Sequence, residues 1–158
     1  MSYEADAAIR AEAFSELTLA VYRLHSALLT RGDAVVASLG LTSARWQVLG
    51  AIAGASEAPS VPAVAGAMGL SRQAVQKQVD LLLEDGLIAA RANPAHGRSP
   101  LYQLTGAGRA ALARADQRWS SEAAHLSDAI SSPALRASAR LLDELAERLE
   151  GTGLEEPP

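Results

Sequence analysis

The stretch that decides the fold is SVPAVAGAMGLSRQAVQKQVDLLLEDGLI, residues Ser60–Ile88. A short apolar helix is predicted over residues 61–68, and Gly69 begins a turn after it. Ser71 is a good N-cap for a longer helix, and Gly86 has the position of a glycine that ends one. Two helices joined by a glycine turn cross at a steep angle. The stretch therefore predicts a helix-turn-helix.

A β-hairpin is predicted directly after these helices. Residues 87–91 and 101–104 have the pattern of short strands, and the turn-forming residues Asn93, Pro94, His96 and Gly97 lie between them. Two helices joined by a glycine turn occur in many helical domains. The order helix, turn, helix, strand, polar turn, strand is typical of a winged helix-turn-helix.

The spacing of apolar residues on the second helix separates its two faces. Val75, Val79, Leu82 and Leu83 share one face and are expected in the core. The opposite face carries side chains that can read bases in the major groove, where Arg pairs with guanine and Gln with adenine. The first amides of the helix can also hold a phosphate. The predicted DNA contacts are Ser71, Arg72, Gln73, Gln76 and Lys77 on the helix and Arg91, His96 and Arg98 on the wing.

The flanking segments predict long helices. One runs from about residue 8 to 36, with Gly32 expected to break or bend it, and the next follows an N-cap at Thr42. Thr105 is the expected N-cap of a helix that runs to about residue 130. Ser132 is the expected N-cap of a last helix, which ends at Gly151. The fold class is mainly α with a small β-hairpin wing: a winged helix-turn-helix on a helical dimerisation frame.

The whole chain, 1–158, is predicted to be a single domain. Residues 1–40 and 110–151 form the helical dimerisation region, residues 41–109 the winged helix-turn-helix, and residues 152–158 a flexible tail. The net charge of −4 is unevenly distributed, at −2 over residues 1–60, +2 over 61–109 and −4 over 110–158. A net positive charge over residues 61–109 is the distribution expected when one segment of a chain faces DNA phosphates.

Composition removes several classes of function. The chain has no cysteine, which excludes disulfides, thiolate metal sites and thiol redox sensing, and its three histidines have no metal-ligand spacing. No cofactor or metal is expected. The apolar stretches are shorter than the ~20 residues of a membrane span, and the acidic N-terminal region is unlike a signal peptide. We therefore expect a cytoplasmic protein.

Three segments carry a resemblance to a known family: Leu41–Ala53, Ser60–Ile88 and Asn93–Leu112, which reads NPAHGRSPLYQLTGAGRAAL. They resemble the MarR family of bacterial transcription regulators, and the likeness extends over essentially the whole chain. The resemblance implies a homodimer whose first and last helices interlock, bound to pseudo-palindromic DNA. The dimer contacts that it implies include Phe14, Leu17, Val21, Leu142, Leu145 and Leu149. The same apolar stripes also fit an intramolecular core.

The resemblance also implies an effector. Many relatives release DNA when a small, often anionic aromatic molecule binds between the dimer frame and the DNA-binding lobes. Candidates to line such a site here are Tyr22, His25, Arg45, Trp46 and Trp119, and each also fits an ordinary core, interface or surface role.

The predicted function is that of a sequence-specific, homodimeric repressor that binds double-stranded DNA. An enzyme is disfavoured because the acidic residues, such as Asp143, Glu144 and Glu147, have the spacing of a solvated helix face, and no phosphate-binding glycine loop follows a strand. A protein-interaction module that uses the winged fold without DNA remains the alternative, since fold does not fix function.

Overall fold

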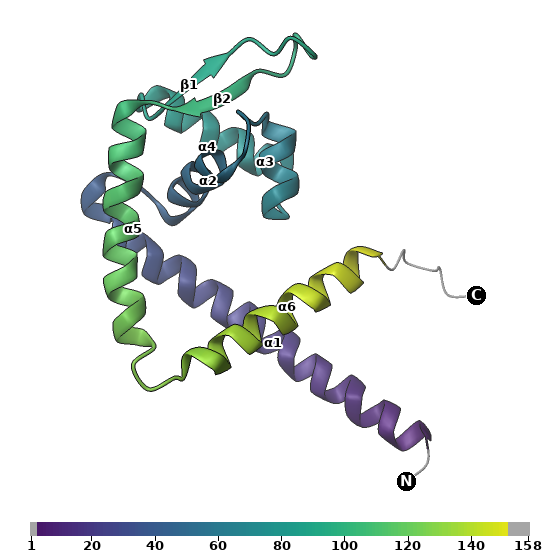
Figure 1. The fold of residues 1–158 in the computed structure, drawn as a ribbon. Helices are drawn as coiled ribbons and strands as arrows, with labels where there is room; N and C mark the ends of the chain where they lie inside the picture. Colours follow the sequence, from purple (N-terminus) through teal and green to yellow (C-terminus); the bar gives the residue numbers. More distant parts are fainter. Residues whose placement is uncertain (1–2, 152–158) are drawn as a thin grey trace. The chain divides into compact units, whose positions relative to one another are not determined.

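A computed structural model describes residues 3–151 of the chain (Figure 1). The predicted tail, residues 152–158, lies outside the described residues. The chain forms two compact units, one up to Trp119 and one from Ser120 onward, and each is described by itself. The division falls within a single helix.

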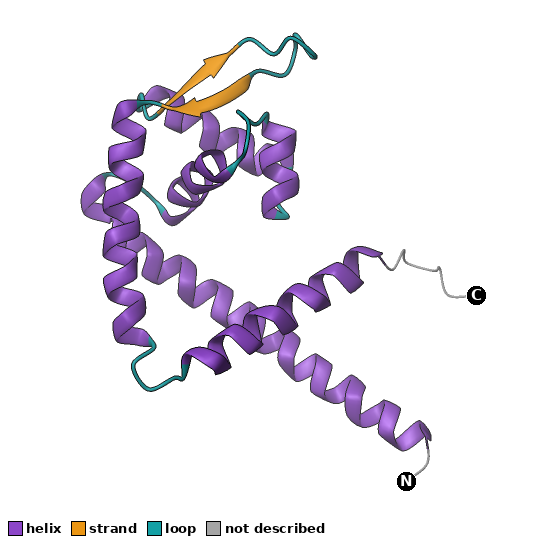
Figure 2. Cartoon of the chain, in the orientation of Figure 1, coloured by secondary structure: helices purple, strands orange, loops and turns teal. Residues whose placement is uncertain are grey.

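The described residues form six α-helices, one short 3-10 helix and one antiparallel hairpin (Figure 2). These elements confirm the predicted mainly α fold with a small β-hairpin wing. In chain order the elements are α1 (Tyr3–Val36), the 3-10 helix η1 (Ala37–Leu39), α2 (Ser43–Gly54), α3 (Val61–Met68), α4 (Arg72–Glu84), β1 (Ile88–Arg91), β2 (Leu101–Leu104), α5 (Gly106–Leu126) and α6 (Ser132–Gly151).

Three helices of the first unit, α2, α4 and α5, start at hydroxyl caps, as the sequence predicts. Thr42 Oγ1 accepts a hydrogen bond from the Arg45 amide, and Ser71 Oγ accepts one from Ala74 at 3.1 Å. Thr105 Oγ1 accepts from the Gly108 amide at 3.0 Å. Each bond satisfies an amide that the first turn of a helix leaves without a partner.

Two local predictions are wrong. Gly32 does not break α1, because the helix continues to Val36. The glycine is needed for packing: a Cβ there would lie 2.5 Å from Ser43 Oγ. The cap of α6 is Ser131, one residue before the predicted Ser132, since Ser131 Oγ accepts from the Ala134 amide at 3.3 Å.

The core of the first unit lies between α2, α3, α4, the hairpin and the first half of α5. Val75, Val79 and Leu82 are fully buried, which confirms the predicted inner face of α4. In the hairpin, Ile88 pairs with Leu104 and Arg91 with Leu101. The amide of Tyr102 also donates to the Pro59 carbonyl at 2.9 Å, so that the hairpin is tied to the segment that leads into α3.

The base of the hairpin is joined closely to α5. Thr105 Oγ1 donates to the Gly86 carbonyl at 2.8 Å, and the Thr105 amide donates to the Leu87 carbonyl at 3.0 Å. Gly108 packs directly on the Leu87 backbone, where a Cβ would lie 1.9 Å from the carbonyl oxygen. The absence of a side chain at Gly108 thus lets α5 begin against the base of the wing.

Among the described helices, none is by itself long and apolar enough to cross a membrane. One pair, residues 3–39 with α2, passes that test on length and composition only, and it is bent by 83°.

Candidate nucleic-acid interface

The exposed face of α4 carries the side chains that the sequence predicted to contact DNA. Arg72, Gln73, Gln76 and Lys77 are all exposed, and the buried valines of the same helix point to the opposite side. Ser71 caps the helix by accepting from the Ala74 amide. The other amides of the first turn lie at the same N-terminal end of α4. A helix N-terminus with exposed amides favours anions such as phosphate.

Gln76 is held by a neighbour that is not among the predicted DNA contacts. Its Nε2 donates to Asp80 Oδ1 at 2.7 Å, one helical turn further along the exposed face. The bond uses the Gln76 amide nitrogen, and Asp80 adds a carboxylate to the candidate reading surface. A carboxylate accepts from the amino group of cytosine but repels phosphate. The spacing of four residues was the signal in the sequence.

One wing arginine lies close to these helix residues. A cavity of about 420 Å³ is lined by Arg72, Gln73 and Gln76 from α4 and by Arg98 from the wing loop, with Tyr102 also in its wall. The structure thus brings Arg98 and the first turns of α4 to the same groove. We refer to this cavity as the α4–wing groove.

The wing loop is shaped by Asn93. Its Oδ1 accepts from the amides of Ala95 (3.0 Å) and His96 (3.3 Å), and its Nδ2 donates to the Ser99 carbonyl at 2.8 Å. These bonds close the loop between the strands and leave His96 and Arg98 exposed. The sequence predicted a turn here with Asn93 among its turn-forming residues, but not the bonds that Asn93 makes.

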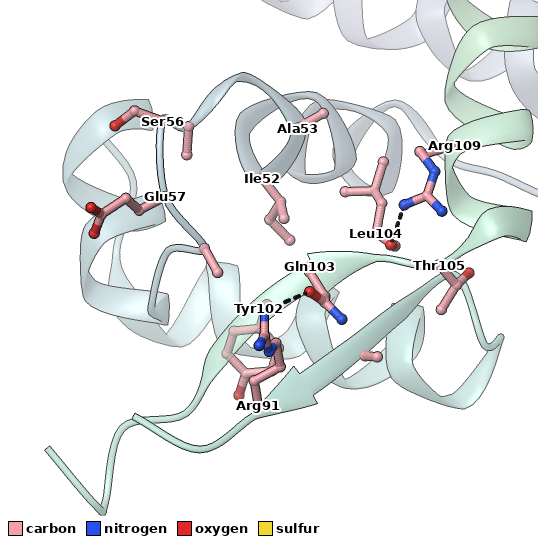
Figure 3. A pocket seen from close by; sticks show the side chains of 13 residues that line it. Ile52, Ala53, Ser56, Glu57, Arg91, Tyr102, Gln103, Leu104, Thr105 and Arg109 are labelled. Carbon is pink, nitrogen blue, oxygen red and sulfur yellow. Dashed lines mark hydrogen bonds between the residues drawn. The ribbon is translucent and has the colours of Figure 1, made fainter. Parts of the chain in front are cut away.

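Two other predicted contacts lie away from the groove. Arg91 is on β1, where its Nη1 donates to Gln103 Oε1 at 3.1 Å, and it lines a separate cavity (Figure 3). Lys77 lines a third cavity, of about 450 Å³, together with Arg45 and Asp33. The eight predicted residues therefore do not form one continuous pocket.

The candidate effector residues divide into three groups. The rings of Trp46 and Trp119 meet edge to face at 5.7 Å between centroids, and Trp46 Nε1 donates to Asp116 Oδ1 at 2.8 Å. Tyr22 and His25 are exposed on α1. Of the five candidates, only Arg45 lines the 450 Å³ cavity.

Arg45 is already engaged in the structure. Its Nη1 contacts Asp85 Oδ2 at 2.5 Å, and its Nη2 donates to the Gly40 carbonyl at 2.8 Å. The side chain thus joins the α1–α2 corner to the C-terminal end of α4. A cation at a helix C-terminus is also favourable to the helix dipole. No pattern in the sequence indicates this partner forty residues away.

The residues implied in a dimer are mostly accessible to solvent. Phe14 on α1 and Leu142 and Leu149 on α6 are exposed, and Leu17, Val21 and Leu145 are half-buried. No residue of α6, all of which is described, is buried. Each of these two helices therefore exposes large apolar side chains to water, which is unfavourable.

Comparisons with known proteins agree with this architecture. The sequence pattern of the MarR family matches residues 39–99. Uncharacterized proteins of Mycobacterium tuberculosis and Mycobacterium bovis are 36% identical to this chain over 124 residues, which are 78% of this chain and 85% of each relative. Solved structures of MarR family transcription regulators have the same fold.

Solved structures similar to this chain include complexes with DNA and with small molecules. MosR of Mycobacterium tuberculosis, solved in complex with DNA, is 24% identical with a TM-score of 0.69, over 84% of this chain and 96% of that one. CouR of Rhodococcus jostii, solved with p-coumaroyl-CoA, is 22% identical with a TM-score of 0.73, over 82% of this chain and 91% of that one. The fold and the family match over residues 39–99 together show that this chain belongs to the MarR family of winged helix-turn-helix transcription regulators.

Proposed function

We propose that this chain is a cytoplasmic regulator that binds double-stranded DNA in a sequence-specific manner as a homodimer and represses transcription from a pseudo-palindromic operator. The observation that supports this most is the α4–wing groove, where three exposed polar side chains of α4 and Arg98 of the wing line the same space. Arg and Gln are the side chains that form two hydrogen bonds to guanine and adenine edges.

The residues of α4 have different expected roles. Arg72 and Gln76 lie in the groove and are assigned to base edges. Lys77 lies outside the groove and is assigned to phosphate, which needs charge rather than a fixed geometry. Phosphate contacts give affinity that depends on salt, whereas base contacts give sequence preference.

The exposed apolar side chains of α1 and α6 support a dimer. Association of two copies through these faces removes the exposed side chains of Phe14, Leu142 and Leu149 from water. Two-fold symmetry then sets the two recognition helices about 34 Å apart, or a multiple of it, along the DNA. Occupation of a promoter by such a dimer blocks polymerase, which is the basis for proposing repression.

An effector is the last part of the proposal. CouR, solved with an acyl-CoA, supports a small-molecule ligand for this chain as well. The ligand is expected to be aromatic or anionic and to bind near Trp46 and Trp119, whose edge-to-face contact makes their fluorescence a reporter. An aromatic acid that binds there should change this fluorescence and release DNA at the same concentration. A panel of aromatic acids that does neither would remove the effector from the proposal.

The DNA-binding proposal is tested by fluorescence anisotropy at two salt concentrations. The probes are the DNA upstream of the protein's own gene and a scrambled duplex of equal length. Lys77→Ala should weaken binding to both duplexes and lower the salt slope by about 1. Arg72→Ala and Gln76→Ala should each cost about 1–3 kcal/mol on the preferred duplex and little on the scrambled one.

A control variant separates these effects from general damage. Arg114 is an exposed arginine of α5 outside the α4–wing groove, and Arg114→Ala should bind both duplexes like the wild type. If all three α4 variants bind as the wild type does, DNA recognition by this face is wrong. The winged fold would then be assigned to protein interaction instead.

A further inference from the structure

Asp80 is an exposed residue of α4 that is not among the predicted DNA contacts. Its Oδ1 accepts a hydrogen bond from Gln76 Nε2 at 2.7 Å, a length typical of bonds to a charged acceptor. Gln76 lines the α4–wing groove, whereas Asp80 is not part of its wall. Within the groove, the effect of Asp80 is therefore exerted through the Gln76 side chain.

The direction of this bond follows from the chemistry of the two groups. A carboxylate offers only acceptors, whereas the amide of a glutamine has two N–H donors and one carbonyl oxygen. The nitrogen of Gln76 must therefore face Asp80, because two oxygens that both carry lone pairs repel each other. Rotation of the amide by half a turn breaks the bond and brings the two oxygens together.

The bond to Asp80 leaves Gln76 with one N–H donor and its carbonyl oxygen. Among residues 3–151, the structure gives the Gln76 side chain no second hydrogen bond and gives Asp80 no ion pair with a cation. Gln76 therefore has one donor and one acceptor available to a base.

Adenine is the base whose major-groove edge matches these two groups. It has an acceptor at N7 and a donor at the N6 amino group, whereas guanine has two acceptors, N7 and O6. A glutamine whose amide is not held can use both N–H groups on guanine, but here one of them is occupied by Asp80. We propose that Asp80 is a positioning residue that makes Gln76 select adenine and reject guanine. This inference rests on the proposed function, since it concerns DNA bound by α4.

Bound DNA strengthens the effect of Asp80 on Gln76. On the exposed surface of a free helix, water competes for the bond, and side-chain pairs four residues apart contribute little to stability. A base that covers Gln76 excludes this water, and hydrogen bonds in less polar surroundings are stronger. Asp80 also brings a negative charge to a face that binds phosphates, so it lowers affinity for every sequence while it sharpens the base preference.

The base preference is measured on the duplex that the wild-type chain selects from a random pool. Competition anisotropy with all four base pairs at each position identifies the Gln76 position as the one whose preference Gln76→Ala removes. The wild type should bind adenine there about tenfold more tightly than guanine, and Asp80→Asn should reduce this ratio to about threefold or less. Asparagine donates as well as accepts, so it no longer fixes the amide of Gln76.

Two further variants separate positioning from charge. Asp80→Glu keeps a carboxylate acceptor four residues from Gln76 and should keep the adenine preference. Glu84→Gln removes a carboxylate one turn further along the same exposed face and should tighten binding to the adenine and guanine duplexes equally. A wild-type preference for guanine at the Gln76 position would overturn the proposal, and so would a ratio that Glu84→Gln lowers as much as Asp80→Asn does.

The double variant Gln76→Ala with Asp80→Asn distinguishes positioning from direct contact with a base. If Asp80 acts through Gln76, Asp80→Asn has no further effect on base preference once residue 76 is alanine. A further change at any position, such as loss of a preferred cytosine, means that Asp80 itself reads a base and contradicts the positioning role.

Failure of the proposed function gives a different result. A wild-type chain that enriches no sequence from the pool contradicts DNA recognition as a whole, and the positioning role falls with it. An enriched sequence in which no position depends on Gln76, or in which the adenine preference persists in Asp80→Asn, contradicts the positioning role while DNA recognition stands.

Discussion

Gly108 shows how one missing side chain fixes the position of the wing. A Cβ at this residue would lie 1.9 Å from the Leu87 carbonyl oxygen, which already accepts from the Thr105 amide. The atoms that a Cβ at Gly108 would meet belong to the Leu87 backbone, which cannot move aside as a flexible side chain does. We therefore expect Gly108→Ala to lower the free energy of unfolding by about 3 kcal/mol, measured by urea denaturation.

Gly106, two residues earlier in α5, is the matched control for this change. No atom lies within 4 Å of a Cβ built on Gly106, so that Gly106→Ala should leave the stability unchanged or raise it slightly. Equal losses for the two alanine variants would show that the close approach of α5 to Leu87 is not what makes glycine necessary.

At the residue scale, the sequence predicted those features that depend on one helix alone. The two faces of α4 follow from spacing, so that Val75 and Val79 were placed in the core and Arg72 outside it. The contact of Arg45 with Asp85 was not foreseen, because it joins residues forty positions apart and exists only once α2 and α4 are packed. The place of Arg98 beside α4 likewise depends on the packed hairpin.

The start of α4 is an element whose stability depends on one hydroxyl. Ser71 Oγ accepts from the Ala74 amide at 3.1 Å, and loss of such a cap costs about 1 kcal/mol. We expect Ser71→Ala to lower the free energy of unfolding by that amount in denaturant titrations. Ser60 occupies the same position before α3 but makes no cap bond through its side chain, so Ser60→Ala should cost clearly less.

The helix starts and ends were largely predictable because caps act over three residues. Thr42, Ser71 and Thr105 begin their helices as predicted, and Gly86, with φ at +67°, follows the end of α4. The errors at Gly32 and Ser132 have a different origin. The need for glycine in α1 comes from Ser43 across the α1–α2 corner, and two adjacent serines before Pro133 made the cap of α6 ambiguous from sequence.

At the scale of the molecule, the apolar faces of α1 and α6 are the basis for a second copy. Leu142→Glu combined with Leu145→Glu places two charges per chain on the apolar face of α6. Burial of a leucine contributes about 1.5–3 kcal/mol, so we expect these changes to convert the dimer to monomer. Sedimentation velocity measures this as a loss of the species with twice the chain mass.

Arg140 is on the opposite face of α6 by helical spacing, and it provides a control of similar charge change. Arg140→Glu should leave the dimer intact. A wild-type protein that sediments as a monomer at micromolar concentration, or a double variant that remains dimeric, would contradict the assignment of these faces to dimerisation. Whether an apolar face meets its own chain or a second copy is not encoded in its periodicity, which is why the sequence left both interpretations open.

The most direct test of the account is selection of DNA by the wild-type chain from a pool of random duplexes, followed by sequencing. A dimer that places two copies of α4 in successive major grooves predicts enrichment of an inverted repeat with half-sites about 10 base pairs apart, centre to centre. The same selection with Arg72→Ala and Gln76→Ala combined should lose preference within the half-sites. A folded wild-type protein that enriches no sequence over the starting pool would contradict the claim that α4 reads DNA.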